Sequence, residues 1–307
     1  YKVWFAKYNA GQSEVSVEDD AVGSGAGVDR FLAGTVEFGA SDDPLSDQEI
    51  SQVTRGAVLT PATPGSVTIA YSLAGVPDGL KLPRDVYVDI FLGKITHWND
   101  ERIQKANPDV KLPPQLIEVV VRSDGSGTTF AFTNHLAAIS DAWKSGPGVG
   151  KKVQFPPGST RAPGNEGVAG AIKRTPGAIG YVVYAVARNV GLHTASLENQ
   201  AGKFIQPTGS SGMQTLANVP LDNQLRAFAA DPAGDESYPI VTYSWLLLYR
   251  DYPSAEKAAA VKNLVRWCLT QGQSLSEQVG YVPLADNVAQ AGLARLEEVQ
   301  TTGQPTQ

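Results

Sequence analysis

Residues 122–130 read RSDGSGTTF and place several oxyanion-binding groups within one short stretch. Arg122 contributes a planar cationic fork, and the hydroxyls of Ser126 and Thr128 contribute hydrogen-bond donors. The glycines between these side chains carry no Cβ, so the backbone can approach a ligand closely. The types and spacing of these residues predict a cradle for a small tetrahedral anion.

The same stretch has a simpler interpretation as turn chemistry, in which Asp124 or Ser126 only caps the following helix. The letters DGSG by themselves do not separate a cap from an anion site. Arg122 and Asp124, however, stand two residues apart in front of four potential donors, which is more than a cap requires. This density of polar groups favours the anion cradle.

The flanking residues predict the elements that hold the cradle. Residues 116–121 form an apolar run rich in β-branched side chains, which is typical of a buried strand. Residues 129–139 carry an apolar stripe at helical spacing. A helix that starts after the turn has N–H groups without intrahelical partners and a positive dipole end. We therefore expect the anion to bind at this helix N-terminus.

A second glycine-rich turn lies near the beginning of the chain. Residues 22–32 read VGSGAGVDRFL, with Ser24 near the start of an expected helix. Residues 35–40 read as a short strand, and Asp42 follows at its carboxyl end, where open α/β sheets bind ligands. The alternative for Asp42 is a turn or cap role ahead of the helix that starts near Ser46, and that fate is the more frequent one.

Composition limits the class of protein. The chain has 307 residues, of which 42% are hydrophobic and 18% charged, enough for a large core divided into two domains. Its net charge of −6 and pI near 5.2 argue against nucleic acid or an anionic membrane as the main partner. An anion must therefore be held by local donors, because the overall field repels it.

Cysteine and histidine usage argues against disulfide and metal chemistry. Cys268 is the single cysteine, and we interpret it as a small buried hydrophobe. His97, His135 and His193 are scattered without metal-ligand spacing, so we expect surface or capping roles. We expect neither a metal nor a cofactor.

No apolar run approaches the roughly 18 residues of a membrane span, and no signal peptide opens the sequence. Because Tyr1 is not a methionine, we expect the chain to begin part-way into a longer product, and such a start is compatible with a removed export signal.

Strand and helix patterns alternate along the chain, which predicts an α/β architecture. β-rich segments near 70–75 and 238–245 are expected to cross between domains. The first lobe would then comprise residues 1–72 plus 243–307, and the second lobe residues 73–242, as in a hinged binding protein. Other expected elements are helices at 1–8, 83–93, 100–106, 168–172, 255–270 and 286–298, strands at 14–18, 66–73 and 177–184, and a surface loop at 145–167.

Six motifs resemble those of the periplasmic phosphate-binding protein of the phosphate ABC transporter, the PstS family, and they occur in the order found in that family. They read GSGAGV at 23–28, FGASDDPLS at 38–46, GKITHWND at 93–100, RSDGSGTTFAFT at 122–133, PGAIGYVVYA at 176–185 and GYVPL at 280–284. The motifs span nearly the whole chain. The match is specific because all six agree, whereas any one of them would be weak.

The resemblance implies a two-lobed, periplasmic-binding-protein-like fold of type II, hinged between lobes, with one dehydrated phosphate in the interlobe cleft. It also implies roles at matching positions. Ser24 donates to the phosphate from the first lobe, and Asp42 accepts a hydrogen bond from a phosphate OH. On the second lobe, Arg122 pairs with the ligand and is oriented by Asp124. The remaining donors are Ser126, Gly127 and Thr128.

The beginning of the chain departs from the family pattern. Family members carry a Gly-Ala-Thr-Phe-Pro-like strand and turn shortly before the residue that matches Tyr1, and that turn supplies further donors. We expect that this part has been trimmed, because loss of a central strand would expose ladder groups and apolar surface.

The resemblance predicts high-affinity binding of inorganic phosphate and delivery to the membrane permease of an ABC importer. The chain would act as a monomer, in the periplasm or on a lipid anchor at the outer face of the cytoplasmic membrane, and not as an enzyme. Alternatives are a receptor for arsenate, sulfate, molybdate or a sugar phosphate, a phosphate-ester hydrolase, and an interaction protein with scaffold lobes. Asp42 would reject sulfate, which has no OH to offer it, whereas arsenate keeps the OH.

Overall fold

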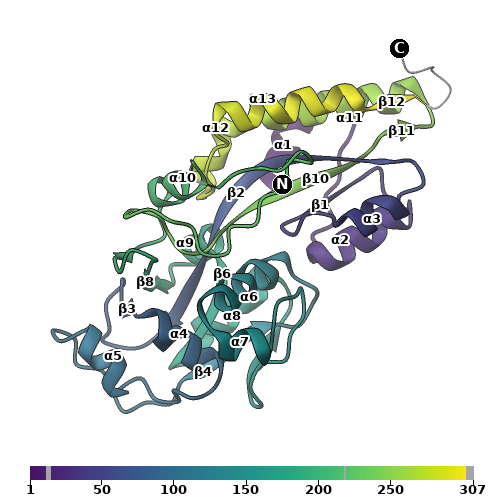
Figure 1. Cartoon of the computed structure of the whole chain (residues 1–307). Coiled ribbons are helices and arrows are strands. Elements are labelled where there is room, and N and C mark those ends of the chain that lie inside the picture. The colour runs from purple at the N-terminus through teal and green to yellow at the C-terminus, as the bar shows by residue number, and fades with distance from the viewer. Residues whose placement is uncertain (12–14, 218, 302–307) are drawn as a thin grey trace. The chain divides into compact units, whose positions relative to one another are not determined.

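A computed structural model describes residues 1–11, 15–217 and 219–301. The chain divides into two compact units. Unit 1 comprises Tyr1–Pro64, Leu221–Ala227 and Tyr243–Gln307, and unit 2 comprises Gly65–Pro220 and Phe228–Thr242. Both units combine strands and helices (Figure 1). The α/β class predicted from the sequence is therefore confirmed.

Unit 1 is built on a short sheet flanked by helices. Strand β1 (Phe38–Ser41) pairs antiparallel with β10 (Val241–Tyr249), which in turn lies beside the long strand β2 (Ala57–Ser72). Helices α11 and α13 pack side by side in this unit (Figure 1). The remaining elements are α1 (Lys2–Ala10), α2 (Gly23–Leu32), α3 (Asp47–Gln52), β11 (Asp251–Tyr252), α11 (Ala255–Leu269), α12 (Gln273–Ser276), η1 (Glu277–Val279), α13 (Asp286–Arg295), η2 (Leu296–Glu298) and β12 (Gln300–Thr301).

Helix α2 packs closely on β1 because its sequence is rich in glycine. A Cβ at Gly27 would lie 2.7 Å from the carbonyl oxygen of Ala40, so only glycine fits at this contact. Further along the helix, the ring of Phe31 stacks on Tyr249 with centroids 4.4 Å apart, and both side chains are buried. The Tyr249 hydroxyl donates to the Phe31 carbonyl at 2.7 Å, so this buried polar group has a partner.

Unit 2 contains a sheet in the order β2, β6, β4, β5, with β7 also paired to β2. Strand β4 is parallel to both of its neighbours, whereas β2 and β6 are antiparallel. Strands β3, β8 and β9 form a separate small sheet. The elements are β3 (Lys81–Leu82), α4 (Arg84–Phe91), α5 (Glu101–Ala106), β4 (Glu118–Arg122), α6 (Gly127–Ile139), α7 (Asp141–Ser145), β5 (Thr160–Ala162), α8 (Gly164–Arg174), β6 (Ala178–Val183), α9 (Tyr184–Val190), β7 (His193–Thr194), β8 (Ser196–Glu198), β9 (Phe204–Ile205) and α10 (Gly209–Ala217).

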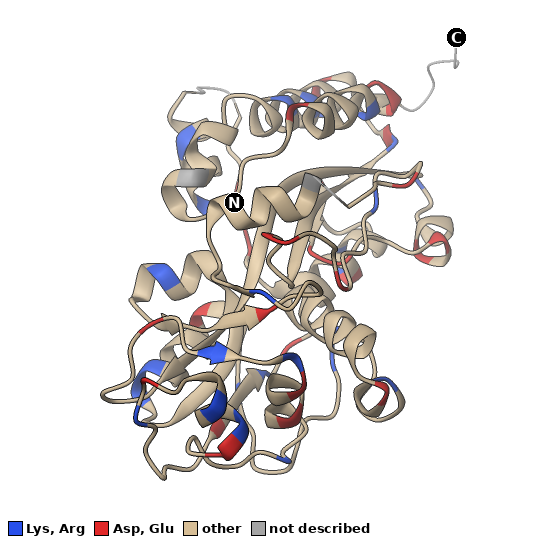
Figure 2. Ribbon diagram, turned by 60° about the vertical axis from the view of Figure 1, so that its left-hand side comes forward, with Lys and Arg blue, Asp and Glu red and all other residues tan. Residues whose placement is uncertain are grey.

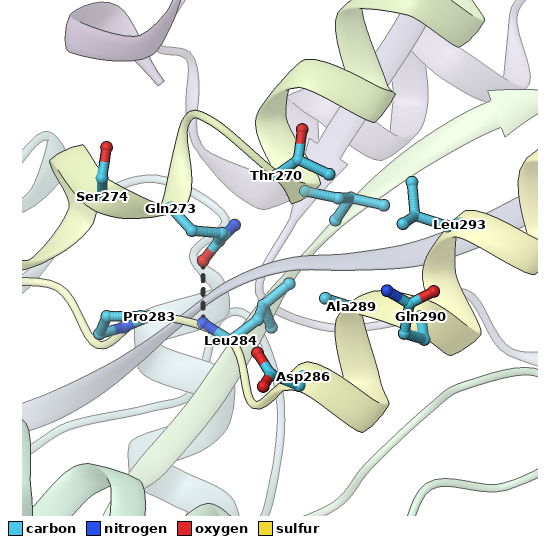
Figure 3. Close-up of a pocket in the computed structure, with 10 residues that line it drawn as sticks. Thr270, Gln273, Ser274, Pro283, Leu284, Asp286, Ala289, Gln290 and Leu293 are labelled. Carbon is cyan, nitrogen blue, oxygen red and sulfur yellow. Dashed lines mark hydrogen bonds between the residues drawn. The ribbon is translucent and has the colours of Figure 1, made fainter.

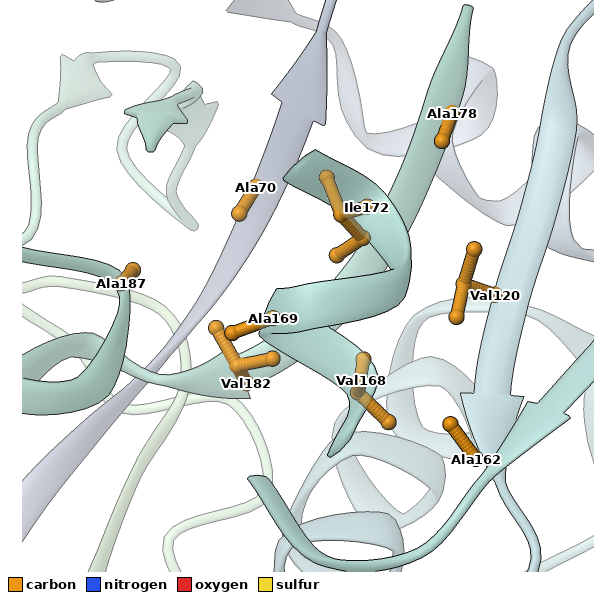
Figure 4. Close-up of a cluster of buried hydrophobic side chains, with 9 residues drawn as sticks. All are labelled: Ala70, Val120, Ala162, Val168, Ala169, Ile172, Ala178, Val182 and Ala187. Carbon is orange, nitrogen blue, oxygen red and sulfur yellow. The ribbon is translucent and has the colours of Figure 1, made fainter. Parts of the chain in front are cut away.

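Strand β6 of the unit 2 sheet is buried throughout, so both faces of the sheet are covered at this strand. Side chains alternate between faces along a strand, so Val182 and Tyr181 point in opposite directions. Val182 belongs to an aliphatic cluster under α8, together with Val120 and Ile172 (Figure 4). Tyr181 instead stacks on Phe132 of α6, with centroids 4.4 Å apart. Helices α8 and α6 thus lie on opposite faces of the strands that carry the cradle.

Several expectations from the sequence need correction. Residues 145–167 are not one long loop, since they contain β5 and the first turn of α8, which begins at Gly164 and not at 168. In the expected strand 14–18, residue 14 lies outside the described residues, and residues 15–18 form no strand. His135 is fully buried, whereas a surface or capping role was expected. Its neighbours explain the difference, because both ring nitrogens have hydrogen-bond partners.

Charged side chains of both signs occur in each unit (Figure 2). In the described part of the chain, no helix is long and apolar enough to cross a membrane.

Candidate functional site

Strand β4 ends at Arg122, and its side chain is buried beside the carboxylate of Asp124. Only 4% of the Arg122 side chain is exposed. Its Nε donates to Asp124 Oδ1 at 2.8 Å, and its Nη2 donates to Oδ2 of the same carboxylate. The third contact runs from Nη1 to Thr128 Oγ1 at 3.5 Å. The guanidinium carries five N–H groups, and two of them have no partner among the described residues.

Asp124 is held from two sides. Besides the paired contact with Arg122, its Oδ1 accepts the backbone N–H of Gly164 at 3.1 Å. Burial by itself raises the pKa of the Asp124 carboxyl, but the hydrogen bonds and charge of Arg122 and the Gly164 N–H bring that pKa below its ordinary value. Asp124 is therefore ionised at neutral pH, and it fixes the orientation of the guanidinium.

The N-terminus of α6 lies beside the Arg122 guanidinium, which contacts Thr128 in the first turn of the helix. Ser126 is the N-cap, and its Oγ accepts the Thr129 N–H at 3.1 Å. Gly127 and Thr128 occupy the first two positions of the helix, where backbone N–H groups have no intrahelical acceptor. No described residue accepts from these two N–H groups. The cap proposed as an alternative thus exists, and it leaves donors available for an anion.

Two further residues from α8 and β6 complete this cluster, and the sequence interpretation did not include them. Asn165 lies beside Thr128, with its Nδ2 3.4 Å from Thr128 Oγ1. Tyr181 bonds to the Thr129 hydroxyl at 2.7 Å and accepts the Arg122 backbone N–H at 3.4 Å. Burial raises the pKa of Tyr181 to about 12, against the opposing effect of the Thr129 hydrogen bond, so its phenol stays neutral.

In unit 1 the structure brings Ser24 and Asp42 together. Ser24 is buried in the first turn of α2, and Asp42 directly follows β1. The Asp42 backbone N–H donates to Ser24 Oγ at 3.1 Å. Ser24 does not cap this helix, because the N-cap is Val22 and no side chain caps it. Its hydroxyl accepts from Asp42 and keeps its own proton to donate.

The predicted residues therefore form two sets, each within one unit. Arg122, Asp124, Ser126, Gly127 and Thr128 form one set at the end of β4 and the start of α6, and Ser24 with Asp42 forms the other. The first set combines a buried cation with neutral donors, which together satisfy oxyanion oxygens without a metal. Among the described residues, no group of three or more His, Cys, Asp or Glu side chains could hold a metal ion.

A separate pocket in unit 1 contains none of these residues. It has a volume of about 350 Å³ and lies between the end of α11, α12 and α13 (Figure 3). Its Gln273 accepts the Leu284 backbone N–H at 2.8 Å and also donates to the backbone, so this amide is already used in holding the segments together. This pocket shares no residue with the two sets described above.

A family model described as a PBP superfamily domain matches residues 2–271, so the fold and the sequence define a member of the PBP superfamily. A relative named phosphate-binding protein PstS, from Pasteurella multocida strain Pm70, is 39% identical over 293 residues, which are 94% of this chain and 84% of that protein. The chain belongs to the PstS family of phosphate-binding proteins. The resemblance inferred from the six motifs is thus confirmed.

Solved structures agree on the fold. A high-affinity periplasmic phosphate-binding protein bound with phosphate matches with a TM-score of 0.75 and 21% identity, over 92% of this chain and 88% of that chain. A phosphate-binding protein from Stenotrophomonas maltophilia matches with a TM-score of 0.72 and 20% identity, over 89% of this chain and 85% of that chain. These similarities confirm the predicted periplasmic-binding-protein-like fold.

Proposed function

We propose that this chain binds inorganic phosphate and delivers it to the membrane permease of an ABC importer. The observation that carries the proposal is the buried Arg122–Asp124 pair beside the N-terminus of α6, where two backbone N–H groups await an acceptor. Membership of a family whose relatives are named phosphate-binding proteins supports the same ligand. An acidic chain needs such local donors, because its net charge of −6 repels anions.

Each residue of the second-unit set has a distinct proposed role. Arg122 pairs with the phosphate oxygens through the N–H groups that Asp124 does not use. Ser126 and Thr128 donate their hydroxyl protons, and Gly127 donates its backbone N–H. Asp124 orients the guanidinium, and its carboxylate accepts from Arg122 and from the Gly164 N–H.

Ser24 and Asp42 are proposed as the phosphate contacts of unit 1. Ser24 donates its hydroxyl proton, and the Asp42 carboxylate accepts a hydrogen bond from a phosphate OH. With a second pKa of about 6 to 7, phosphate at neutral pH is a mixture of its monobasic and dibasic forms, and both forms keep at least one OH. Sulfate has none, so it would set an oxygen against the carboxylate. A site built for such a hydrogen bond rejects the analogue without it by about 10⁴ to 10⁵.

We also propose that the chain acts as an exported, monomeric binding protein and not as an enzyme. One similar structure is of a periplasmic phosphate-binding protein, which supports the periplasm or a lipid anchor facing it as the site of action. The residues near Arg122 offer donors and one engaged carboxylate, but the proposed site contains no nucleophile paired with a base.

The experiment is a calorimetric titration of the full-length protein with phosphate, arsenate and sulfate, run beside an assay with a chromogenic phosphate ester. Tight one-to-one phosphate binding, retained arsenate binding, weak sulfate binding and no ester turnover are expected. Absence of phosphate binding would overturn the proposed ligand, and ester turnover that depends on Arg122 would make the chain an enzyme.

A further inference from the structure

We propose that Asn165 is a positioning residue that directs the hydroxyl proton of Thr128 toward the bound anion. The inference rests on the proposed phosphate site and adds a residue that none of the family motifs used above contains. It concerns four groups only: the amide of Asn165, the hydroxyl of Thr128, the guanidinium of Arg122 and the backbone N–H of Val183.

Asn165 is held in place by the start of α8. It is the second residue of that helix, and the preceding Gly164 donates its N–H to Asp124 at 3.1 Å. Gly164 has a φ of +64°, a conformation that favours glycine at the turn into α8. The aliphatic cluster beneath α8 anchors the same helix on β4 and β6 (Figure 4). The amide therefore reaches Thr128 from a rigid element.

The backbone determines which way the amide points. The Val183 N–H lies 3.1 Å from Asn165 Oδ1, and a peptide N–H can only donate, so the atom facing it must be the oxygen. The nitrogen Nδ2 then faces Thr128 Oγ1 at 3.4 Å. The competing contact, from Thr128 Oγ1 to Oδ1 at 3.5 Å, is longer, and it shares that oxygen with the Val183 N–H, so it is the weaker of the two.

In this arrangement the Thr128 hydroxyl can still donate its proton. Its oxygen receives N–H groups from Asn165 Nδ2 at 3.4 Å and from Arg122 Nη1 at 3.5 Å. A hydroxyl has two acceptor lone pairs and one proton, and both lone pairs here receive N–H groups. The acceptor nearest to the proton is Asn165 Oδ1, at the long distance of 3.5 Å. Thr128 is only 1% exposed, so water is a poor substitute for a closer acceptor. An oxyanion at the start of α6 is its natural acceptor.

A double-mutant cycle on phosphate affinity tests the inference. Asn165→Ala should weaken phosphate binding about tenfold in the wild-type background, the value of one hydrogen bond. In a Thr128→Val background, which has no proton to direct, the same change should weaken binding by less than about twofold. In a Ser126→Ala background it should again weaken binding about tenfold, because Ser126 shares no hydrogen bond with Asn165.

A purely structural role for Asn165 predicts equal losses in all three backgrounds, and that result would overturn the inference. If Asn165→Ala does not fold, Asn165→Asp keeps the acceptor for Val183 and the shape of the side chain. Its added charge weakens binding in every background, so the loss must be larger in the wild-type background than in the Thr128→Val background. Equal losses in these two backgrounds would again contradict the inference.

The same measurements separate this inference from the proposed function on which it rests. Wild-type protein that binds no phosphate overturns both of them. Wild-type protein that binds phosphate tightly, combined with an additive mutant cycle, overturns the role of Asn165 alone.

Discussion

The backbone N–H of Gly164 and the carboxylate of Asp124 are joined by a hydrogen bond of 3.1 Å, although forty residues separate them in the sequence. The carboxylate that orients Arg122 therefore also fixes the start of α8. Two segments that read as unrelated in the sequence, a glycine-rich turn and a loop rich in Gly and Pro, meet at this one side chain. The orientation of the guanidinium consequently depends on both segments.

Replacing Arg122 by lysine should weaken phosphate binding about 100-fold. The lysine keeps the positive charge but loses the planar fork that contacts both oxygens of Asp124, so the cation is no longer oriented. Calorimetry measures the change. Arg174→Lys, on the exposed end of α8, is the matched control and should bind as the wild type does. If Arg122→Lys binds phosphate with unchanged affinity, the planar guanidinium of Arg122 has no role in phosphate binding.

Replacing Asp42 by asparagine should reduce the discrimination between phosphate and sulfate. The amide can donate to a sulfate oxygen, so the penalty against an anion without an OH becomes smaller. Phosphate and sulfate affinities of the full-length protein give the ratio, which should fall by at least about tenfold. Asp29→Asn on the exposed side of α2 tests for a general effect of charge. Should both variants keep the wild-type ratio, Asp42 has no role in selectivity.

The stability of the protein should fall as the pH is lowered from about 6.5 toward 4. Burial lowers the pKa of His135 from 6.5 to about 4, despite the hydrogen bond to Ala230 and the nearby Asp231. In this window the unfolded chain takes up a proton that the folded chain does not, so the free energy of unfolding falls by up to about 3 kcal/mol. Denaturant unfolding across the pH range measures this slope.

His135→Gln should make that slope shallower, because the titrating group is gone. His97 is exposed, so His97→Gln is the matched control and should keep the wild-type slope. An equal slope in wild type and His135→Gln would assign the pH dependence to other groups.

Replacing Gly27 by alanine should destabilise unit 1 by about 1–3 kcal/mol. The new Cβ would lie 2.7 Å from the Ala40 carbonyl oxygen, so α2 must move away from β1. Gly11→Ala is the control, since its Cβ would make only an ordinary contact at 3.6 Å. Thermal unfolding should show a lower midpoint for Gly27→Ala alone. Because Ser24 lies on α2 and its hydroxyl contacts Asp42, which follows β1, the variant should also bind phosphate more weakly.

The local part of the site could be predicted from the sequence. Arg122, Asp124, Ser126 and Thr128 lie within seven residues of one another, so strand, turn and helix signals place them together without knowledge of the fold. Asn165 is 37 residues from Thr128. The segment around it is rich in Gly and Pro, which predicts a loop and gives no sign of the helix that starts there. Tertiary contacts bring Asn165 to the cradle, among them the pairing of β5 with β4 and the hydrogen bond from Gly164 to Asp124.

The burial of polar residues also could not be predicted from local sequence patterns. His135 looked like a surface or capping histidine, since residue type says little about burial. Its partners are the Tyr87 hydroxyl at 2.7 Å and the Ala230 carbonyl at 2.7 Å, which are 48 and 95 residues away. A residue whose environment is made by such distant segments requires the tertiary structure before its role can be assigned.

The division of the chain into interleaved segments has a consequence for biosynthesis. Apart from Leu221–Ala227, unit 2 occupies one continuous stretch, from Gly65 to Thr242, whereas unit 1 needs β10 and α11, which come after it. Chains emerge from the ribosome N-terminal end first, and domains fold as units. Unit 2 can therefore fold while unit 1 is still waiting for its central strand. The first 64 residues, including Ser24 and Asp42, must stay without their β10 partner until the chain has been made as far as Tyr249.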